Sequence, residues 1–219
     1  MKLRRGEKIL VAIVFVSLAI SLGCYWKLPE EITVGWGGSD WRPMQSGPKF
    51  LGTFLFNMLM AVMFLPYFLF TRFKKRADDK RYTYYDQLLV WLFAFYFCFQ
   101  LYVVFWNFGY RIQVRPERLL LPFLGLLFFA LGETFAHAEQ DWFISLGNRF
   151  TRRNKIIWKK THEAAGKWLK VAGVAGLLGL VLPFRYAVYP TAVFGTYALI
   201  CPFIACLKLR HTDADKRNT

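Results

Sequence analysis

Two side chains that commonly bind metals, Glu133 and His137, lie four residues apart at the end of an apolar segment. On a helix this spacing puts both on one face, where a carboxylate and an imidazole could act as metal ligands. Two ligands do not complete a coordination shell, and the only other donors nearby are Glu139, Asp141 and His162. The sequence therefore predicts no metal and no other cofactor, and we expect Glu133 to form hydrogen bonds where the segment ends.

The chain lacks the residue patterns of the common enzyme classes. It contains no nucleophile paired with a base, no HExxH, no DxxD-type cluster and no glycine-rich phosphate loop. The four cysteines form no CxxC pair, which favours small packing residues over a zinc site or a disulfide framework. We therefore predict that the protein is not an enzyme.

A second group of chemically varied side chains recurs at helical spacing between residues 154 and 169. Trp158, Thr161 and His162 share one face of the predicted helix, which Asn154 would cap at its N-terminus. Another face of the same helix carries three charged residues spaced by four, which are Lys159, Glu163 and Lys167. We expect the face of Trp158, Thr161 and His162 to carry function; in the alternative, the tryptophan is an interfacial anchor and the histidine bonds a neighbouring loop.

These residues belong to a chain whose composition is that of a membrane protein, with 56% hydrophobic and 19% aromatic residues. A bilayer core about 30 Å thick requires roughly 20 apolar residues per helix. Six segments meet this length, and their lack of strand alternation predicts helices. The predicted spans are Ile9 to Trp26, Phe50 to Phe70, Leu88 to Phe108, Leu119 to Ala136, Trp168 to Phe184 and Ala187 to Leu207. The fold class is therefore an all-α, six-helix transmembrane bundle.

The distribution of positive charge predicts the topology. Of the 29 lysines and arginines, 21 fall before the first span, in alternate loops and after the last span. The positive-inside rule then places both termini in the cytoplasm. The charge run at 72–81 is expected to anchor to lipid of the inner leaflet, and the net charge of +15 does not indicate nucleic-acid binding because no reader motif accompanies it.

Several residues within the spans predict how the helices pack. Gln100, a polar side chain near the middle of the third span, is expected to form an interhelical hydrogen bond. Small residues spaced by four in the fifth span predict the close approach of another helix; these are Ala172 with Gly176 and Ala175 with Gly179. Pro190 and Pro202 are expected to kink or bound the sixth helix.

The loop between the first two spans predicts an organised external structure. It is rich in glycine, proline and tryptophan, and a short strand or hairpin is expected at Ile32 to Trp36. Trp36 and Trp41 suit the level of the lipid headgroups.

Two stretches of the chain resemble the SdpI-type immunity and signal-transduction membrane proteins of bacteria. One is a W-x-K-T-H-x-x-A-G-K run, which this chain matches with Trp158, Lys160, Thr161, His162, Ala165, Gly166 and Lys167. Upstream of it Trp142, Phe143, Ile144 and Thr151 also fit the family. The other stretch is an L-P-x-x-I-x-V-H-W module at the external loop, matched by Leu28, Pro29, Ile32, Val34, Trp36 and, further on, Lys49.

The chain also departs from the family pattern. Gly35 replaces the usual histidine of the external module. The run before Trp158 lacks the family's usual asparagine, glycine, arginine, threonine, proline and tryptophan. In their places, in that order, are Asp141, Ser145, Gly147, Asn148, Arg149 and Phe150. Arg149 lies two places beyond the position of the family's arginine and is the candidate to replace it.

The resemblance implies a division and a role for the chain. It implies a two-helix module with the external loop at 1–83 and a four-helix domain at 84–219. It implies a multi-pass protein of the bacterial cell membrane that protects against a secreted peptide toxin, and in some members holds a cytoplasmic repressor. The alternative is a small transporter or channel, for which Gln100, Glu133 and Lys170 would be the polar groups lining a path.

The topology can be tested with reporter fusions at five positions. Fusions after Lys49, Arg76, Arg115, Lys160 and the C-terminus should report outside, inside, outside, inside and inside. The expectation follows from the 21 cationic residues assigned to the cytoplasmic side. An external signal from the Lys160 fusion would contradict the six-span arrangement.

Overall fold

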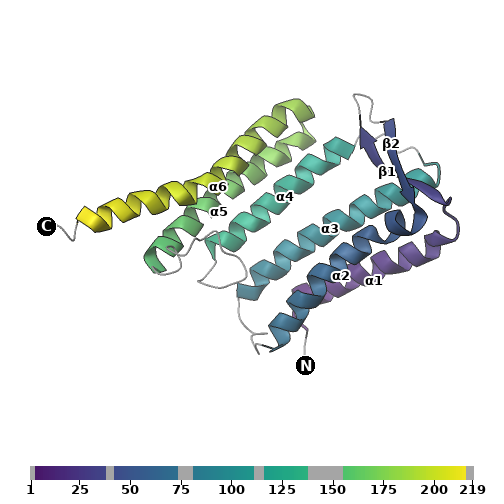
Figure 1. Ribbon diagram of the computed structural model, residues 1–219, viewed down its shortest axis with the longest axis horizontal. Coiled ribbons are helices and arrows are strands. Elements are labelled where there is room, and N and C mark those ends of the chain that lie inside the picture. The colour runs from purple at the N-terminus through teal and green to yellow at the C-terminus, as the bar shows by residue number, and fades with distance from the viewer. Residues whose placement is uncertain (1–2, 38–41, 74–80, 111–115, 138–154, 216–219) are drawn as a thin grey trace. The chain divides into compact units, whose positions relative to one another are not determined.

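The computed structural model describes residues 3–37, 42–73, 81–110, 116–137 and 155–215. The described part is mostly helical, as expected, and contains one two-stranded sheet. Figure 1 shows the elements in chain order. They are α1 (Arg5–Tyr25), β1 (Glu31–Gly37), β2 (Arg42–Pro48), α2 (Lys49–Phe73), α3 (Arg81–Asn107), α4 (Pro116–Ala136), α5 (Lys155–Leu177), the 3₁₀ turn η2 (Leu178–Leu180) and α6 (Phe184–Asp215).

The chain forms two compact units, Met1–Arg115 and Pro116–Thr219. The first holds α1, α2, α3 and the sheet, and the second holds α4, α5, η2 and α6. The boundary lies after α3 rather than at residue 83, because α3 packs along α1 and α2. The division at residue 83, which the family resemblance implies, concerns sequence modules and stays a prediction. It differs from the boundary between the two compact units.

A buried network of polar side chains joins the three helices of the first unit. The Gln100 amide nitrogen donates to the Ser21 hydroxyl at 2.6 Å and to the Ser17 carbonyl at 3.0 Å, so the expected interhelical bond is confirmed. Ser17 in turn donates to the Asn57 side-chain oxygen at 2.8 Å and contacts the Gln100 oxygen, and Asn57 donates to Ser21 at 2.7 Å. Because buried polar groups are costly unless bonded, this network fixes the register of α1, α2 and α3.

A second cluster, built on an ion pair, closes one end of the same unit. Arg4 donates to both carboxylate oxygens of Asp86, at 2.9 and 3.0 Å, and to the Tyr67 hydroxyl at 3.1 Å. Tyr67 donates to Asp86 at 2.7 Å, and Glu7 accepts from the backbone N–H of Arg4 as a helix cap at 2.9 Å. The fork of the guanidinium thus ties the start of α1 to α3 and α2.

The hairpin of β1 and β2 is docked on the opposite end of the unit. Asn107, at the end of α3, accepts from the Thr33 N–H at 2.8 Å and donates to the Thr33 carbonyl at 2.9 Å. Ile32 is 1% exposed and packs with Leu28 and Val103. The strand expected at Ile32 to Trp36 is confirmed as part of β1, and Gly52 gives its side chains room because a Cβ there would lie 2.4 Å from Ile32 Cδ1.

In the second unit α5 packs against α4 and α6. A Cβ added to Gly132 would lie 2.7 Å from the Gly166 carbonyl, and one added to Gly125 would lie 2.7 Å from the Gly173 carbonyl. Gly176 is similarly close to the backbone of Gly125. The close approach expected on α5 is confirmed, with α4 as the approaching helix.

Three helices of the described chain are long and apolar enough to cross a membrane: Arg5–Tyr25, Lys49–Leu69 and Thr83–Asn107. Leu120–Ala136 is a shorter apolar helix. The predicted fifth span, 168–184, is not one helix, because α5 ends at Leu177 and η2 precedes a new start at Phe184. Pro190 and Pro202 were expected to kink or bound the sixth helix; α6 runs through both as one element, so neither bounds it.

Replacing Gln100 with leucine should destabilise the first unit by about 1–2 kcal/mol, because Ser17 and Ser21 lose their hydrogen bonds to the amide in an apolar surrounding. The readout is the thermal unfolding midpoint of the purified protein in detergent. Cys98→Ala, at an exposed position two residues away, is the control. Equal midpoints for the two variants would contradict a stabilising role for the network.

Candidate functional site

The family-like run on α5 divides into a buried face and an exposed face. Trp158 is 2% exposed, and Thr161 and His162 are each 1% exposed. The His162 ring stacks on the Trp158 ring with centroids 3.9 Å apart, and Phe135 of α4 meets His162 edge-on at 5.7 Å. The face that the sequence predicted at a cytoplasmic mouth is therefore packed inside the second unit. Whether it carries function stays a prediction.

Hydrogen bonds within α5 hold this aromatic stack in place. His162 Nδ1 lies 2.9 Å from the Trp158 carbonyl, and the Thr161 hydroxyl donates to the same carbonyl at 2.8 Å. Burial lowers the pKa of the His162 imidazole, and the bond to the carbonyl opposes this only in part. The ring is therefore held in its neutral form and packs as an aromatic group rather than as a charge.

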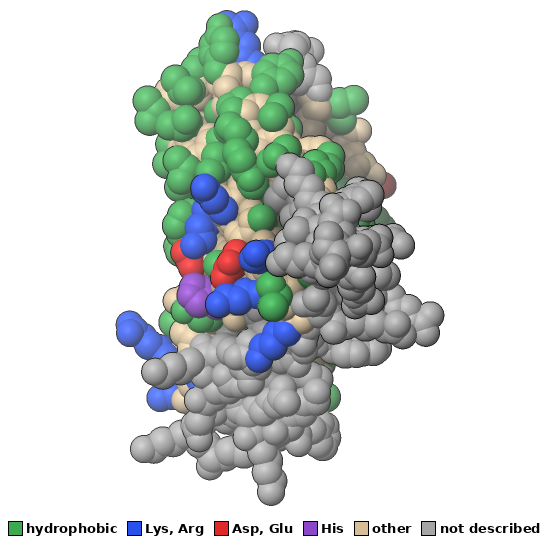
Figure 2. All heavy atoms as spheres, turned by 90° about the vertical axis from the view of Figure 1, so that its left-hand side faces the viewer, with side chains coloured by type: hydrophobic (Ala, Val, Ile, Leu, Met, Phe, Trp, Pro, Cys, Tyr) green, Lys and Arg blue, Asp and Glu red, His purple; other side chains and the backbone are tan. Residues whose placement is uncertain are grey.

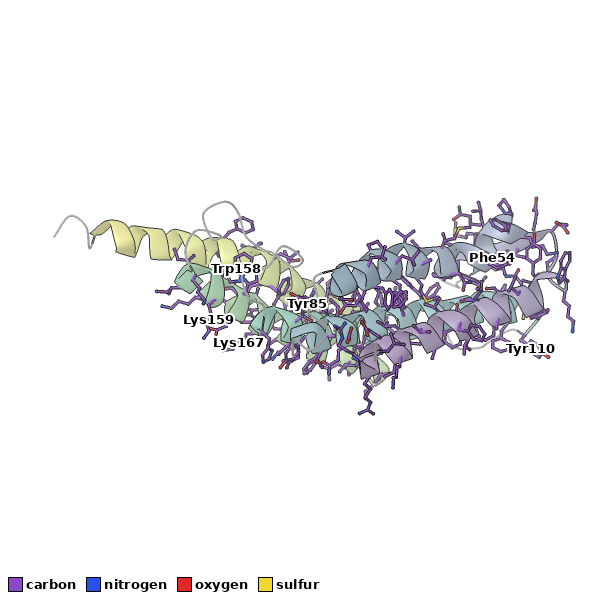
Figure 3. All side chains as sticks on the ribbon, turned by 90° about the horizontal axis from the view of Figure 1, so that it is seen from below. Phe54, Tyr85, Tyr110, Trp158, Lys159 and Lys167 are labelled. Carbon is purple, nitrogen blue, oxygen red and sulfur yellow. The ribbon has the colours of Figure 1, made fainter. Side chains whose placement is uncertain are left out.

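The other face of α5 carries lysines that are open to solvent. Lys155, Lys159, Lys160 and Lys167 are exposed, as is Ile156. Figure 3 shows Lys159 and Lys167 on one side of α5 and Trp158 on the other. Glu163 pairs weakly with Lys159 at 3.8 Å, as their four-residue spacing on the helix allows. Lys160 therefore belongs to the family-like run and is exposed to solvent, unlike Trp158, Thr161 and His162.

Glu133 on α4 forms an ion pair with a lysine of α5. Lys170 Nζ lies 2.6 Å from Glu133 Oε1, and His137 Nδ1 lies 2.9 Å from the Glu133 carbonyl and 3.6 Å from its carboxylate. The described residues contain no group of three or more candidate metal ligands. The ion pair joins α4 to α5, and Lys170 is the partner of Glu133 that the sequence did not identify. Figure 2 shows charged side chains across the middle of one face, with apolar side chains above them.

Five of the residues that match the external module lie in β1 or in the turn that leads to it, and the sixth, Lys49, begins α2. Leu28 and Ile32 are buried against Val103, and Pro29 is exposed in the turn after α1. Trp36 meets the Tyr102 ring edge-on at 4.9 Å and the Trp106 ring at 5.7 Å. Val34 packs at the margin of the same cluster. These residues attach the sheet to the helices rather than form a separate binding pocket.

Some predicted residues lie outside the described part of the chain. Arg149, Asn154 and the degenerate run from Asp141 to Phe150 are among them. Sequence reasoning missed Arg4, Asp86 and Asn107. Arg4 was counted only as a topology signal. Asp86 lies just before the third predicted span, and a carboxylate so close to the membrane was a sign that Asp86 needed a cationic partner.

These features define a class: a helical protein with membrane-length apolar helices, a docked β-hairpin and an α4–α5 crossing that contains the family-like run. The chain is 26% identical over 205 residues to the immunity protein SdpI of Bacillus subtilis (strain 168), covering 92% of each chain. This likeness confirms the resemblance to the SdpI-type family and extends it through both units. No family model and no solved structure matches the chain.

Adding a side chain at the α4–α5 crossing should destabilise the second unit. Gly132→Ala places a methyl group 2.7 Å from the Gly166 carbonyl, and overpacking of this kind costs about 1–3 kcal/mol. The control is Gly23→Ala, where a Cβ meets nothing within 4 Å. Thermal unfolding in detergent should show a lower midpoint for the first variant and an unchanged or higher midpoint for the second. A Gly132→Ala protein as stable as the Gly23→Ala protein would contradict the close crossing.

Proposed function

We propose that this chain is a multi-pass bacterial cell-membrane protein that gives its host tolerance to a secreted peptide toxin and holds a cytoplasmic repressor at the membrane. The observation that carries the proposal is the likeness to an immunity protein along 92% of both chains. The helices of the first unit support the membrane location through their length and apolar composition.

The hairpin supports an external role in toxin recognition. It is a fixed structure rather than a loose loop, because Asn107 bonds both backbone groups of Thr33 and Ile32 is buried. A pre-formed surface loses little conformational entropy on binding a peptide. The predicted topology places this surface outside the cell.

The exposed face of α5 supports the repressor role. Within the family-like run, the buried Trp158, Thr161, His162 and Gly166 hold the helix crossing, which leaves Lys160 and Lys167 free to meet a partner. Lysines on an exposed helix face favour an acidic protein surface through electrostatic complementarity. The same topology puts this face on the cytoplasmic side.

The transporter or channel alternative receives no support from the polar network of the first unit. Gln100, Ser17, Ser21 and Asn57 bond one another and are all buried. A path for ions or solutes requires polar groups that face water. In the described residues, Glu133 and Lys170 also satisfy each other.

The proposal can be tested in the bacterium that encodes the chain. Deleting the gene should make the cells sensitive to the peptide fraction secreted by the undeleted strain, and expression of the chain from a plasmid should restore growth. For the repressor role, the double variant Lys160→Gln and Lys167→Gln should keep tolerance but release to the cytosol a DNA-binding repressor that the parent chain holds in the membrane fraction, measured by membrane fractionation.

The control for charge removal is Lys8→Gln, at an exposed lysine of the first unit. It should leave both tolerance and the location of the repressor unchanged. Deletion cells that grow as well as the parent would contradict the immunity role. A repressor that stays in the membrane fraction with the double variant would contradict the role of the α5 lysines.

A further inference from the structure

The apolar part of the second unit is shorter than the hydrocarbon core of a bilayer, which is about 30 Å thick. On α4 the uncharged stretch between Arg118 and Glu133 is about 22 Å long, at about 1.5 Å per residue. On α5 and η2 the stretch between Lys170 and Leu182 is about 20 Å long. The three membrane-length helices found among the described residues, by contrast, all belong to the first unit.

The charges at one end of this short apolar stretch are fixed at their own level. Lys170 Nζ lies 2.6 Å from Glu133 Oε1, and both side chains are 31% exposed. A lysine that is alone near the edge of a membrane extends its side chain to the headgroups, but the bond to a carboxylate of α4 holds the Lys170 ammonium in place. A partly exposed ion pair is costly in hydrocarbon. The pair therefore belongs at the level of headgroups and water.

Aromatic side chains mark both ends of the same stretch. Beside the ion pair, Trp168 of α5 meets the Tyr197 ring of α6 edge-on at 4.7 Å. At the other end Tyr186 and Tyr189 are exposed, and the Arg185 guanidinium lies 4.7 Å from the centre of the Tyr186 ring. Tryptophan and tyrosine gather at the two interfaces between a membrane and water. Along α6 these two aromatic groups are about 17 Å apart, in agreement with the charges.

The hydropathy of α6 alone indicates a thicker membrane, because its uncharged stretch continues to Leu207. Leu169 packs with Ala198, and Figure 1 shows α5 and α6 side by side, so the residues after Ala198 lie beside the charged half of α5. Hydrocarbon that reached Leu207 would also surround the exposed Glu163 and Lys167. Charged groups cost far more in hydrocarbon than apolar groups cost among headgroups. The hydrocarbon therefore ends near the ion pair.

Beyond the ion pair the second unit combines basic and apolar exposed side chains. The basic ones are on α5 and the apolar ones on α6; they are Lys159, Lys160 and Lys167, and Leu199, Ile200, Phe203 and Ile204. This combination is typical of segments that lie in the headgroup layer, where lysines attract anionic lipids and apolar side chains enter the boundary of the acyl chains.

We propose that the second unit thins the bilayer around it, so that the inner headgroups lie level with the Glu133–Lys170 pair and the outer headgroups with Tyr186 and Tyr189. Bilayers accommodate an apolar segment shorter than their hydrocarbon core by thinning locally. This inference rests on the proposed membrane location and specifies where the hydrocarbon ends. It also keeps Lys167 outside the hydrocarbon, where the proposed repressor can meet it.

The test compares two exposed apolar positions on one helix. Val193 and Ile204 of α6 are 63% and 40% exposed, and each is replaced by cysteine in the full chain. The protein is placed in nanodiscs of phosphatidylethanolamine and phosphatidylglycerol with oleoyl chains, which leave both membrane faces open to a charged maleimide. Mass spectrometry reads the labelling of each position separately, so the native cysteines can stay.

A thiol in hydrocarbon neither ionises nor meets a charged reagent, so we expect Val193→Cys to react about tenfold more slowly than Ile204→Cys, or slower still. Ile200→Cys, at a second exposed position beyond Tyr197, should behave like Ile204→Cys. Two references set the scale. Phe15→Cys, on the exposed side of α1, should be as slow as Val193→Cys, and Lys159→Cys, at an open lysine, should react fast.

Three outcomes would overturn the proposal, and only one of them touches the proposed function. Slow labelling at Val193, Ile200 and Ile204 alike would show a bilayer of full thickness and leave the membrane location intact. Fast labelling at all three, with slow labelling of Phe15→Cys, would place the second unit outside the hydrocarbon. Fast labelling of Phe15→Cys would contradict the membrane location itself, and this inference would fail with it.

Discussion

A bilayer offers no partner for a hydrogen-bonding group, so polar side chains on membrane-length helices must bond within the protein. The first unit meets this constraint at three levels. Arg4 and Asp86 bond at one end, Gln100 bonds α1 at the middle, and Asn107 bonds the hairpin at the other end. Each level includes a residue of α3, so this helix sets the register of the whole unit. The apolar contacts between the helices follow from that register.

The elements with the strongest sequence signals were predicted well. Long apolar runs predicted α1, α2 and α4 close to their observed bounds, and the glycine-rich and tryptophan-rich loop predicted the strand. The end of α3 was also predicted closely, but this helix begins at Arg81, well before the predicted start at Leu88. The break between α5 and α6 was predicted too late in the chain, after Phe184, because the residues from Val171 to Leu182 are all apolar or glycine. Hydropathy carries no information on the 3₁₀ turn at Leu178–Leu180. The units also divide after α3, since packing between helices depends on side-chain partners that a single span does not reveal.

The sequence predicted which residues of the candidate site share a helix face, but it did not predict that this face is buried. The spacing of Trp158, Thr161 and His162 correctly put them on one face, but that face is buried against Phe135 instead of lying open. A face rich in aromatic and hydroxyl groups suits burial as well as binding, and spacing alone does not separate the two. The pairing of Glu133 with Lys170 was missed because the two residues are distant in sequence and meet only where the glycines of α4 and α5 allow close approach.

The attachment of Thr33 to Asn107 gives α3 a mechanical character. α3 has 27 residues and is therefore about 40 Å long as a single helix. One end holds the hairpin through Asn107, and the first turns at the other end hold the Arg4 guanidinium through Asp86. A force applied to the sheet is therefore transmitted along α3 to the ion pair between Arg4 and Asp86 at its other end. The hairpin moves together with α3 rather than independently of it.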